Sequence, residues 1–237
     1  MRTLVTSLLA ALCLGPAACL ANDLTPLESR WVRGVWPVVA FAKSAGLPLD
    51  VVVQPQPTPG AAPLALGFVD GRCKLVLSTR GNAEAQATLD RTDPDLLDAA
   101  LELMAAHELG HCRRYLDGTW MTPPARFSAE AAPSLRAELA NAALHGMRAV
   151  RREEAYADLV GLAWSWHRHR SKYARLHSCL LDERARDLLP GSHHDTLAWV
   201  RLAGDGQALA HPSIFEAAAM LWRDALENAV ADEDGGR

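Results

Sequence analysis

Apolar residues recur at helical spacing through most of the chain, and a few short runs near the N-terminus have the pattern of strands. Residues 25–28, Thr-Pro-Leu-Glu, form a capping box with proline in the first turn and predict a helix that ends near Ser44. The β-branched run at 49–53 predicts a short strand. Two further β-prone runs joined by Asp-Gly predict a hairpin with strands at 64–69 and 72–79.

From Asn82 onward the pattern is helical. Asp93-Pro94 starts a helix that the apolar spacing carries to Asp117, with Gly118 as its stop. Residues 123–132 have the composition of a loop, and further helical patterns lie around 134 and at 147–170, 174–189, 194–202 and 214–230. Together these patterns predict an α+β fold class, a mostly helical domain with a small N-terminal β-sheet.

The first 21 residues have the features of a removable export signal. Arg2 supplies a positive charge, the apolar run at 4–14 is too short to span a bilayer, and small residues lead up to Ala21. Cleavage after Ala21 is expected to release a single domain, residues 22–237, into the periplasm or the medium. No later stretch is long and apolar enough to cross a membrane, so no transmembrane segment is expected in the mature chain.

The cysteines leave two alternatives open. Cys19 allows a lipid anchor at that residue instead of simple cleavage, but Pro16 stands where lipidation signals usually have a branched apolar residue and so disfavours it. Removal of the signal leaves Cys73, Cys112 and Cys179. Three cysteines allow at most one disulfide, and their spacing does not select the pair.

Charge and composition narrow the class of protein. The net charge of −4 is mild and the lysines and arginines are scattered, so nucleic acid is not an expected partner. Hydrophobic residues make up 49% of the chain, which is enough to build an ordinary core without cross-links. The function must therefore be sought in particular side chains.

One motif in the 94–117 helix carries chemistry. His107 and His111 are four residues apart, so both imidazoles lie on one helix face and can bind one ion at about 2.1 Å. Glu108 is offset by one residue and lies beside the metal, where a general base is needed. The alternative is coincidence, expected in about one such chain in a hundred. Three polar groups in an apolar helix are costly without a partner, which favours the metal site.

A catalytic zinc ion needs a third protein ligand, and two stretches offer one. Asp117 is disfavoured because Arg114, in place of a chain-reversing glycine, lets the helix carry Asp117 away. Glu154 and Asp158 are four apart on a second helix, so Glu154 can bind the metal while Asp158 accepts a hydrogen bond from a liganding histidine. Glu153 points about 100° away from that face. The alternative for this stretch is an exposed acidic patch paired with the two arginines before it.

These two motifs, His-Glu-Leu-Gly-His at 107–111 and Glu154 followed by Ala157-Asp158, resemble those of the gluzincin metallopeptidases. They are most similar to the family of the CAAX prenyl protease and the heat-shock protease HtpX, including its soluble periplasmic members. The resemblance covers the two metal helices only. It implies a zincin-like metallopeptidase domain that binds Zn2+. The site residues that it implies are His107, His111 and Glu154 as ligands, Glu108 as general base, and Asp158 as the partner that orients a histidine.

The resemblance also implies how a substrate binds. The strand at 73–79, which precedes the first metal helix, is expected to act as an edge strand that pairs with an extended polypeptide. Relatives have a downstream histidine near the oxyanion. His194 and His211 are candidates for that donor, and a helix-cap or surface role is the alternative for each.

The function expected is that of an exported zinc-dependent endopeptidase, acting in envelope protein quality control. One alternative is a zinc-binding chaperone or assembly factor that rarely cleaves. A structural zinc site is the other, and it is disfavoured because no fourth cysteine or histidine lies at an obvious spacing.

Overall fold

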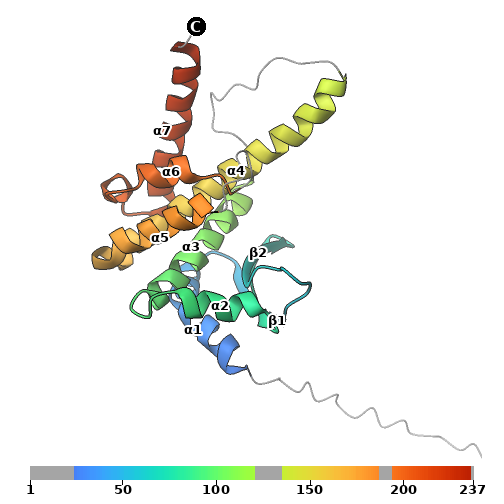
Figure 1. Cartoon of the computed structure of the whole chain (residues 1–237), viewed down its shortest axis with the longest axis vertical. Coiled ribbons are helices and arrows are strands. Elements are labelled where there is room, and N and C mark those ends of the chain that lie inside the picture. Colours follow the sequence, from blue (N-terminus) through green and yellow to red (C-terminus); the bar gives the residue numbers. More distant parts are fainter. Residues whose placement is uncertain (1–23, 121–134, 187–193, 236–237) are drawn as a thin grey trace, which may run out of the picture.

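The computed structural model describes residues 24–120, 135–186 and 194–235 of the chain. Within these residues a small sheet packs beside a larger set of helices, so the predicted α+β fold with a small N-terminal sheet is confirmed (Figure 1). None of the described helices combines the length and apolar content that a membrane span requires. The predicted export signal at 1–21 and the predicted loop at 123–132 lie outside the described residues.

The helices are α1 (Pro26–Ser44), α2 (Ala83–Arg91), α3 (Leu97–Leu116), α4 (Leu135–Arg168), α5 (Tyr173–Arg186), α6 (Leu197–Leu202) and α7 (Ile214–Gly235). Two short 3-10 turns lie at Arg170–Lys172 and Gln207–Leu209. The strands are β1 (Leu49–Pro55), β2 (Leu64–Val69) and β3 (Arg72–Arg80).

Local sequence signals account for the first elements. At the start of α1, Thr25 Oγ1 accepts a hydrogen bond from Glu28 N, and the Glu28 carboxylate accepts one from Thr25 N, which confirms the capping box. Asp70 and Gly71 have φ values of 52° and 71°, the left-handed backbone of a two-residue hairpin turn. The β2–β3 hairpin is therefore confirmed as well.

Several predicted helix boundaries differ from the structure. Helix α3 begins at Leu97 rather than Pro94, because the preceding residues form a turn in which Leu96 N donates to Asp93 O. Helix α4 is one continuous helix where two separate patterns were expected. Helix α6 begins three residues after His194.

The sheet has the strand order β1-β3-β2. Strand β2 pairs antiparallel with β3, and β1 pairs parallel with its other side, with Leu49 opposite Cys73. The prediction that residues 73–79 form an edge strand is therefore wrong. The hairpin alone would leave one side of β3 open, but β1 crosses over and covers it, so the free edges belong to β1 and β2.

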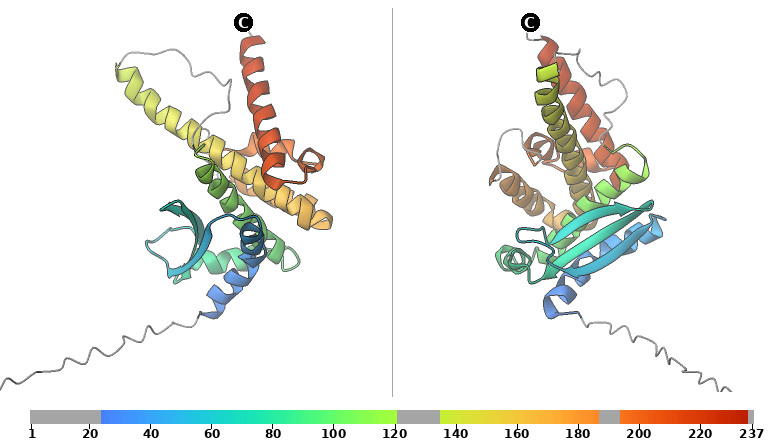
Figure 2. Two further views of the ribbon diagram at one scale, coloured as in Figure 1. Left: turned by 180° about the vertical axis from the view of Figure 1, so that it is seen from behind. Right: turned by 90° about the vertical axis from the view of Figure 1, so that its right-hand side faces the viewer.

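Helices α3 and α4 cross at the centre of the molecule, and the sheet lies on one side of α3 with α5 and α6 on the other (Figures 1 and 2). Glycine makes the close approach of these helices possible. A Cβ atom at Gly110 would lie 2.9 Å from Ala157 Cα, and one at Gly161 would lie 3.0 Å from Leu103 O. Gly110, the fourth residue of the His-Glu-Leu-Gly-His motif, thus allows the two predicted metal helices to pack in contact.

A disulfide joins Cys73 of β3 to Cys112 of α3, and both residues are fully buried. This bond fixes the first metal helix to the central strand. Cys179 is exposed and has a free thiol. The structure thereby selects one pair among the three cysteines that the sequence left open.

Candidate metal centre

Three predicted ligands converge where α3 crosses α4. His107 and His111 of α3 and Glu154 of α4 each offer one donor atom, and these atoms lie within 4.8 Å of one another. The two Nε2 atoms are 3.1 Å apart. The Glu154 carboxylate oxygens lie 3.4 Å from His107 Nε2 and 3.5 Å from His111 Nε2. Among the described residues this is the group of such donors that could hold a metal ion.

The spacing of these donors fits a zinc ion. Ligand atoms about 2.1 Å from a tetrahedral ion are separated from one another by about 3.4 Å. The two imidazole Nε2 atoms, 3.1 Å apart, are close to that value, and Glu154 places Oε2 3.4 Å from His107 Nε2 and Oε1 3.5 Å from His111 Nε2. Two imidazoles and one carboxylate are also a ligand set that catalytic zinc uses, with one coordination position left open.

A polar network holds His107 from behind. Its Nδ1–H donates to Asp158 Oδ1 over 2.9 Å, as the sequence predicted. Asp158 is fully buried and also accepts two hydrogen bonds from Arg184 of α5, at 2.6 and 2.9 Å. Thr196 Oγ1 donates a fourth bond to the same carboxylate at 2.5 Å. These contacts fix the ring orientation of His107 and leave its Nε2 to face the cluster.

His111 has a different environment. Its buried Nδ1 has no hydrogen-bond partner among the residues that the structure describes, and its ring meets the indole of Trp120 edge to face, with centroids 5.3 Å apart. Trp120 stacks on Tyr115 at 4.2 Å, and Tyr115 stacks on Phe68 of β2 at 5.0 Å. A row of aromatic rings therefore runs from the edge strand to the second histidine.

The charges of the ligands are divided unevenly in the metal-free protein. Burial alone lowers the pKa of His107, but hydrogen bonds to Asp158 and Glu154 outweigh it and raise that pKa to about 10. Burial and the neighbouring charge of His107 lower the pKa of His111 to about 3. Burial acts to raise the pKa of Glu154, yet His107 brings it down to about 2. The positive charge therefore resides on His107, beside the Glu154 carboxylate, while His111 is neutral.

Glu108 lies beside the cluster, not in it. Burial raises the pKa of its carboxyl group to about 7, and a hydrogen bond from the backbone of Leu66 on β2 opposes part of that rise. A carboxyl group with a pKa near 7 can both accept and release a proton at neutral pH. Its contact with Leu66 also shows that β2 is the strand that borders the site.

Asp117 and Glu153, the acidic residues weighed against Glu154 as the third ligand, form ion pairs with arginines instead. Asp117 is exposed and pairs with Arg113, outside the cluster, because α3 continues through Arg114 as predicted. Glu153 is buried and receives two hydrogen bonds from Arg114 over 2.8 Å. The alternative reading of Glu153 as part of an exposed acidic patch is therefore wrong.

The two candidate oxyanion donors differ. His194 Nε2 lies 3.9 Å from a Glu154 carboxylate oxygen, and its side chain is 43% exposed. His211 accepts a hydrogen bond from Ser213 N in the turn before α7, the helix-cap alternative, and has no such proximity to the ligands. The structure thus brings His194, and not His211, to the centre.

Sequence reasoning missed Arg184, Thr196 and Trp120 as parts of the centre. Arg184 lies in the charged stretch 182–186, which has the pattern of a solvated helix face.

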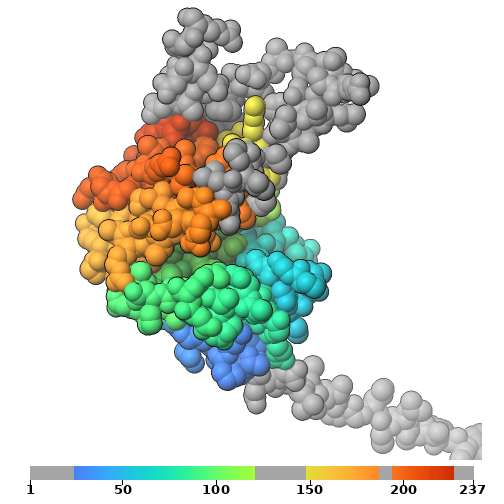
Figure 3. Space-filling view, viewed as in Figure 1, coloured from blue at the N-terminus to red at the C-terminus, as the bar shows by residue number. Residues whose placement is uncertain are grey.

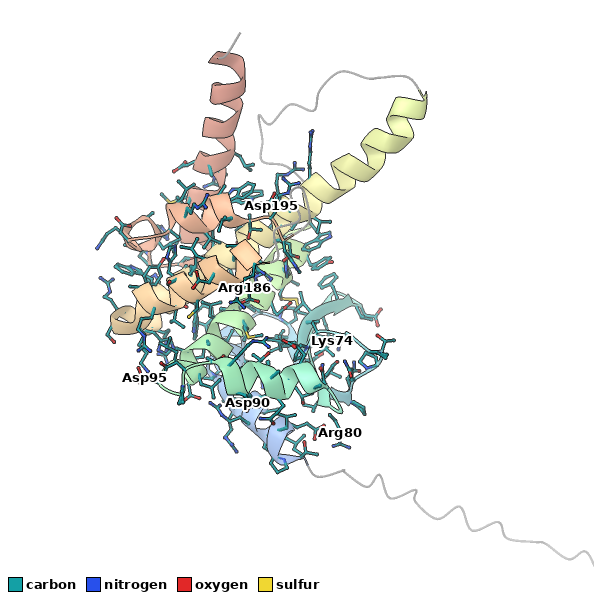
Figure 4. The ribbon with its side chains drawn as sticks, in the orientation of Figure 1. Lys74, Arg80, Asp90, Asp95, Arg186 and Asp195 are labelled. Carbon is teal, nitrogen blue, oxygen red and sulfur yellow. A yellow bond between two sulfur atoms is a disulfide. The ribbon has the colours of Figure 1, made fainter. Side chains whose placement is uncertain are left out.

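Figure 4 labels Arg186, close to Arg184 in the sequence, and also Asp195, which lie on the α5–α6 side of the helix crossing, whereas Lys74 marks the sheet side. In Figure 3 the orange residues of α5 and α6 and the green-to-cyan residues of α2 and the sheet form two lobes, with α3 recessed between them.

Comparison with known protein families, with curated proteins and with solved structures finds no match for this chain. No relative therefore supplies a function or a ligand set. The functional argument rests on the geometry of the centre and on the residues of its two motifs.

Proposed function

We propose that this protein is an exported zinc-dependent endopeptidase. The observation that carries the proposal is the convergence of His107, His111 and Glu154, with one donor atom of each within 4.8 Å of the others, and the partly buried carboxyl group of Glu108 beside them. These residues would hold the ion through two imidazole nitrogens and one carboxylate oxygen. Zinc in such a site supplies Lewis-acid chemistry toward water and the scissile carbonyl group.

Glu108 has the position and the pKa of a general base. It accepts a proton from water as the water oxygen attacks the peptide carbonyl carbon, and it then donates that proton to the leaving amine nitrogen. The peptide C–N bond breaks, and a carboxylic acid and an amine result. The exposed imidazole of His194, close to Glu154, is placed to donate a hydrogen bond to the developing oxyanion.

Strand β2 replaces residues 73–79 as the proposed binding edge. Ser78 N of β3 donates to Pro63 O, so the alternation of an antiparallel pair directs the backbone groups of Leu64, Leu66 and Phe68 outward. The contact between Leu66 and Glu108 lies on this outward side. A polypeptide added to the edge of β2 would therefore pass beside the general base.

The setting proposed is an oxidising compartment outside the cytosol, reached by the export signal at 1–21. The Cys73–Cys112 disulfide supports this setting, since such bonds persist in secreted and periplasmic proteins and are rare in the cytosol. Backbone pairing along an edge strand suits extended or misfolded polypeptides, which supports a role in envelope protein quality control.

Replacing Glu108 by Gln tests the mechanism. We expect Glu108→Gln to keep zinc, by elemental analysis, and to lose peptide hydrolysis by a factor of about 100 or more, with casein as substrate. Asp98→Asn, which neutralises an exposed carboxylate on the same helix, is the control and should keep both. Full activity in Glu108→Gln would exclude Glu108 as the base, and loss of zinc would make it a ligand. Zinc-loaded wild type that cleaves nothing would overturn the peptidase proposal in favour of a zinc-binding chaperone or assembly factor.

Chelator competition tests the ligand set. Glu154→Ala removes one of three proposed donors and should weaken zinc binding far more than Asp117→Ala, because Asp117 pairs with Arg113 outside the cluster. Equal zinc affinity in the two variants would contradict the assignment of Glu154.

A further inference from the structure

The aromatic row beside the metal centre is built from three elements. Phe68 comes from β2, Tyr115 from α3 and Trp120 from the segment after α3, and the rings are nearly parallel, with interplanar angles of 9° and 13°. All three residues are partly exposed. By contrast, the core tryptophans Trp31 and Trp222 are 0% and 3% exposed. Part of the surface of each of these three residues therefore remains accessible.

The register of β2 directs a bound chain toward this row. Leu66 and Phe68 both have outward-facing backbone groups, so an antiparallel chain added to this edge places one residue opposite each. Residues that lie opposite each other across two strands have their side chains on the same face of the sheet. Phe68 and Leu66 face α3, as do their partners Cys73 and Leu75. The residue opposite Phe68 would therefore direct its side chain at Phe68 and Tyr115.

Antiparallel pairing also sets the position of that residue in the bound chain. Leu66 marks the general base through its contact with Glu108, and Phe68 follows two residues later along β2. An antiparallel partner runs in the opposite direction, so its residue opposite Phe68 comes two positions before the residue opposite Leu66. When the residue opposite Leu66 flanks the reacting bond, the residue opposite Phe68 lies on the amino-terminal side of that bond.

We propose that Phe68, Tyr115 and Trp120 form a subsite for one aromatic side chain of the polypeptide substrate, two positions before the residue that faces Leu66. This inference rests on the proposed peptidase function, because it uses the chain direction and the edge strand of that function. The substrate class becomes extended polypeptide with an aromatic residue on the amino-terminal side of the cleavage point.

Ring chemistry favours an aromatic occupant over an aliphatic one. Ring edges carry partial positive charge and ring faces partial negative charge, so the aligned edges of the row attract the face of another ring. Edge-to-face packing contributes beyond the area that is buried, which an aliphatic side chain of similar volume does not share. The same arrangement is already present between Trp120 and His111, at an interplanar angle of 76°.

The test measures binding without catalysis. The probes are N-acetyl-tetraalanine hydroxamate and four versions with one phenylalanine moved along the peptide, bound to zinc-loaded protein and measured by calorimetry. We expect phenylalanine at one position to tighten binding about tenfold, and leucine at that position to tighten it less. The gain should disappear in Trp120→Ala and in Phe68→Leu, which keeps an apolar residue in the strand. It should persist in Trp36→Ala, which removes an indole that is 47% exposed on α1.

The outcomes separate the subsite from the peptidase proposal. Zinc content and circular dichroism identify a variant that fails to fold, and Phe68→Leu then decides in place of Trp120→Ala. No gain at any position, or a gain that survives in Phe68→Leu, would overturn the subsite. Peptide cleavage without any aromatic preference would overturn the subsite alone. A preference for phenylalanine that depends on Phe68, in a protein that cleaves nothing, would support the subsite and overturn the peptidase proposal.

Discussion

The two histidines proposed as zinc ligands are held by contacts of opposite character. His107 is fixed from behind by Asp158, which Arg184 and Thr196 in turn hold with three short hydrogen bonds. His111 has a buried Nδ1 that no group within 24–120, 135–186 or 194–235 hydrogen-bonds, and it lies against the indole of Trp120. One half of the centre is thus a closed polar network, and the other half is apolar and partly exposed.

This difference suggests a separate role for each half of the centre. A buried charged network is rigid and sensitive to the loss of any member, so it suits a group that must keep one orientation. An aromatic surface tolerates changes of shape and has unfilled contacts that a substrate can use. We infer that the His107 side sets metal affinity and stability, and that the His111 side sets substrate choice.

Removing Arg184 is the strongest test of the polar half. Arg184→Ala leaves the buried carboxylate of Asp158 without its cation and should lower the free energy of unfolding by about 3–5 kcal/mol. Chemical denaturation measures this loss. The control is Arg175→Ala, which removes exposed pairs with Asp93 and Asp95 and should lower the free energy of unfolding far less, because solvent screens these pairs. Similar losses in both variants would show that the network around Asp158 does not stabilise the fold.

Metal affinity distinguishes the two halves directly. Asp158→Asn keeps the shape of the side chain but weakens its hold on His107, so zinc affinity should fall by about 10–100-fold. Trp120→Phe keeps a ring beside His111 and should change zinc affinity much less. Competition with a fluorescent chelator gives both values. A larger loss in Trp120→Phe would reverse the proposed division.

Proton release on zinc binding is the smallest effect and the most specific. The raised pKa of His107, about 10, means that this imidazole is protonated at neutral pH, and zinc must displace the proton. His111, with a pKa near 3, is already neutral there. In Glu108→Gln, which removes the other group that titrates near pH 7, we expect about one proton released per zinc at pH 7 and about tenfold tighter binding for each unit of rising pH up to 10.

Calorimetry in buffers of different ionisation enthalpy counts these protons. Without zinc, the stability of the protein should fall as the pH rises. The raised pKa of His107 contributes stability that is complete below about pH 6.5 and is lost as the pH rises through 10. Zinc binding with no proton uptake or release would contradict the charge distribution described for the cluster.

Sequence period was enough to predict the ligands, because residues four apart on a helix share a face whatever the rest of the fold does. It paired His107 with His111 and Glu154 with Asp158; the need for a third ligand and the resemblance to gluzincins joined the two pairs, and the structure shows the four residues together. The hairpin and the α1 capping box were predictable for the same reason, since each is a local pattern.

Helical and strand periodicity does not show which segments far apart in the sequence come into contact. The parallel pairing of β1 with β3 joins strands that are not neighbours in the sequence, and it moved the free edge from residues 73–79 to β2. Arg184 and Trp120 reach the centre only because α5 and the segment after α3 fold back onto it. Nothing in the spacing of either residue indicates such a contact.

The Cys73–Cys112 bond gives the maturation of the centre an order in time. Cys112 directly follows His111, and a bridge that spans 39 residues removes loop entropy worth about 4 kcal/mol from the unfolded chain. Before oxidation, α3 lacks this tie to β3, so the surface that collects His107, His111 and Glu108 is less firmly formed. A chain made in a reducing cytosol would thus be a poor zinc ligand there and would gain the metal after its thiols pair outside. If the protein is the exported peptidase proposed above, the same cross-link would keep it inactive until it has left the cytosol.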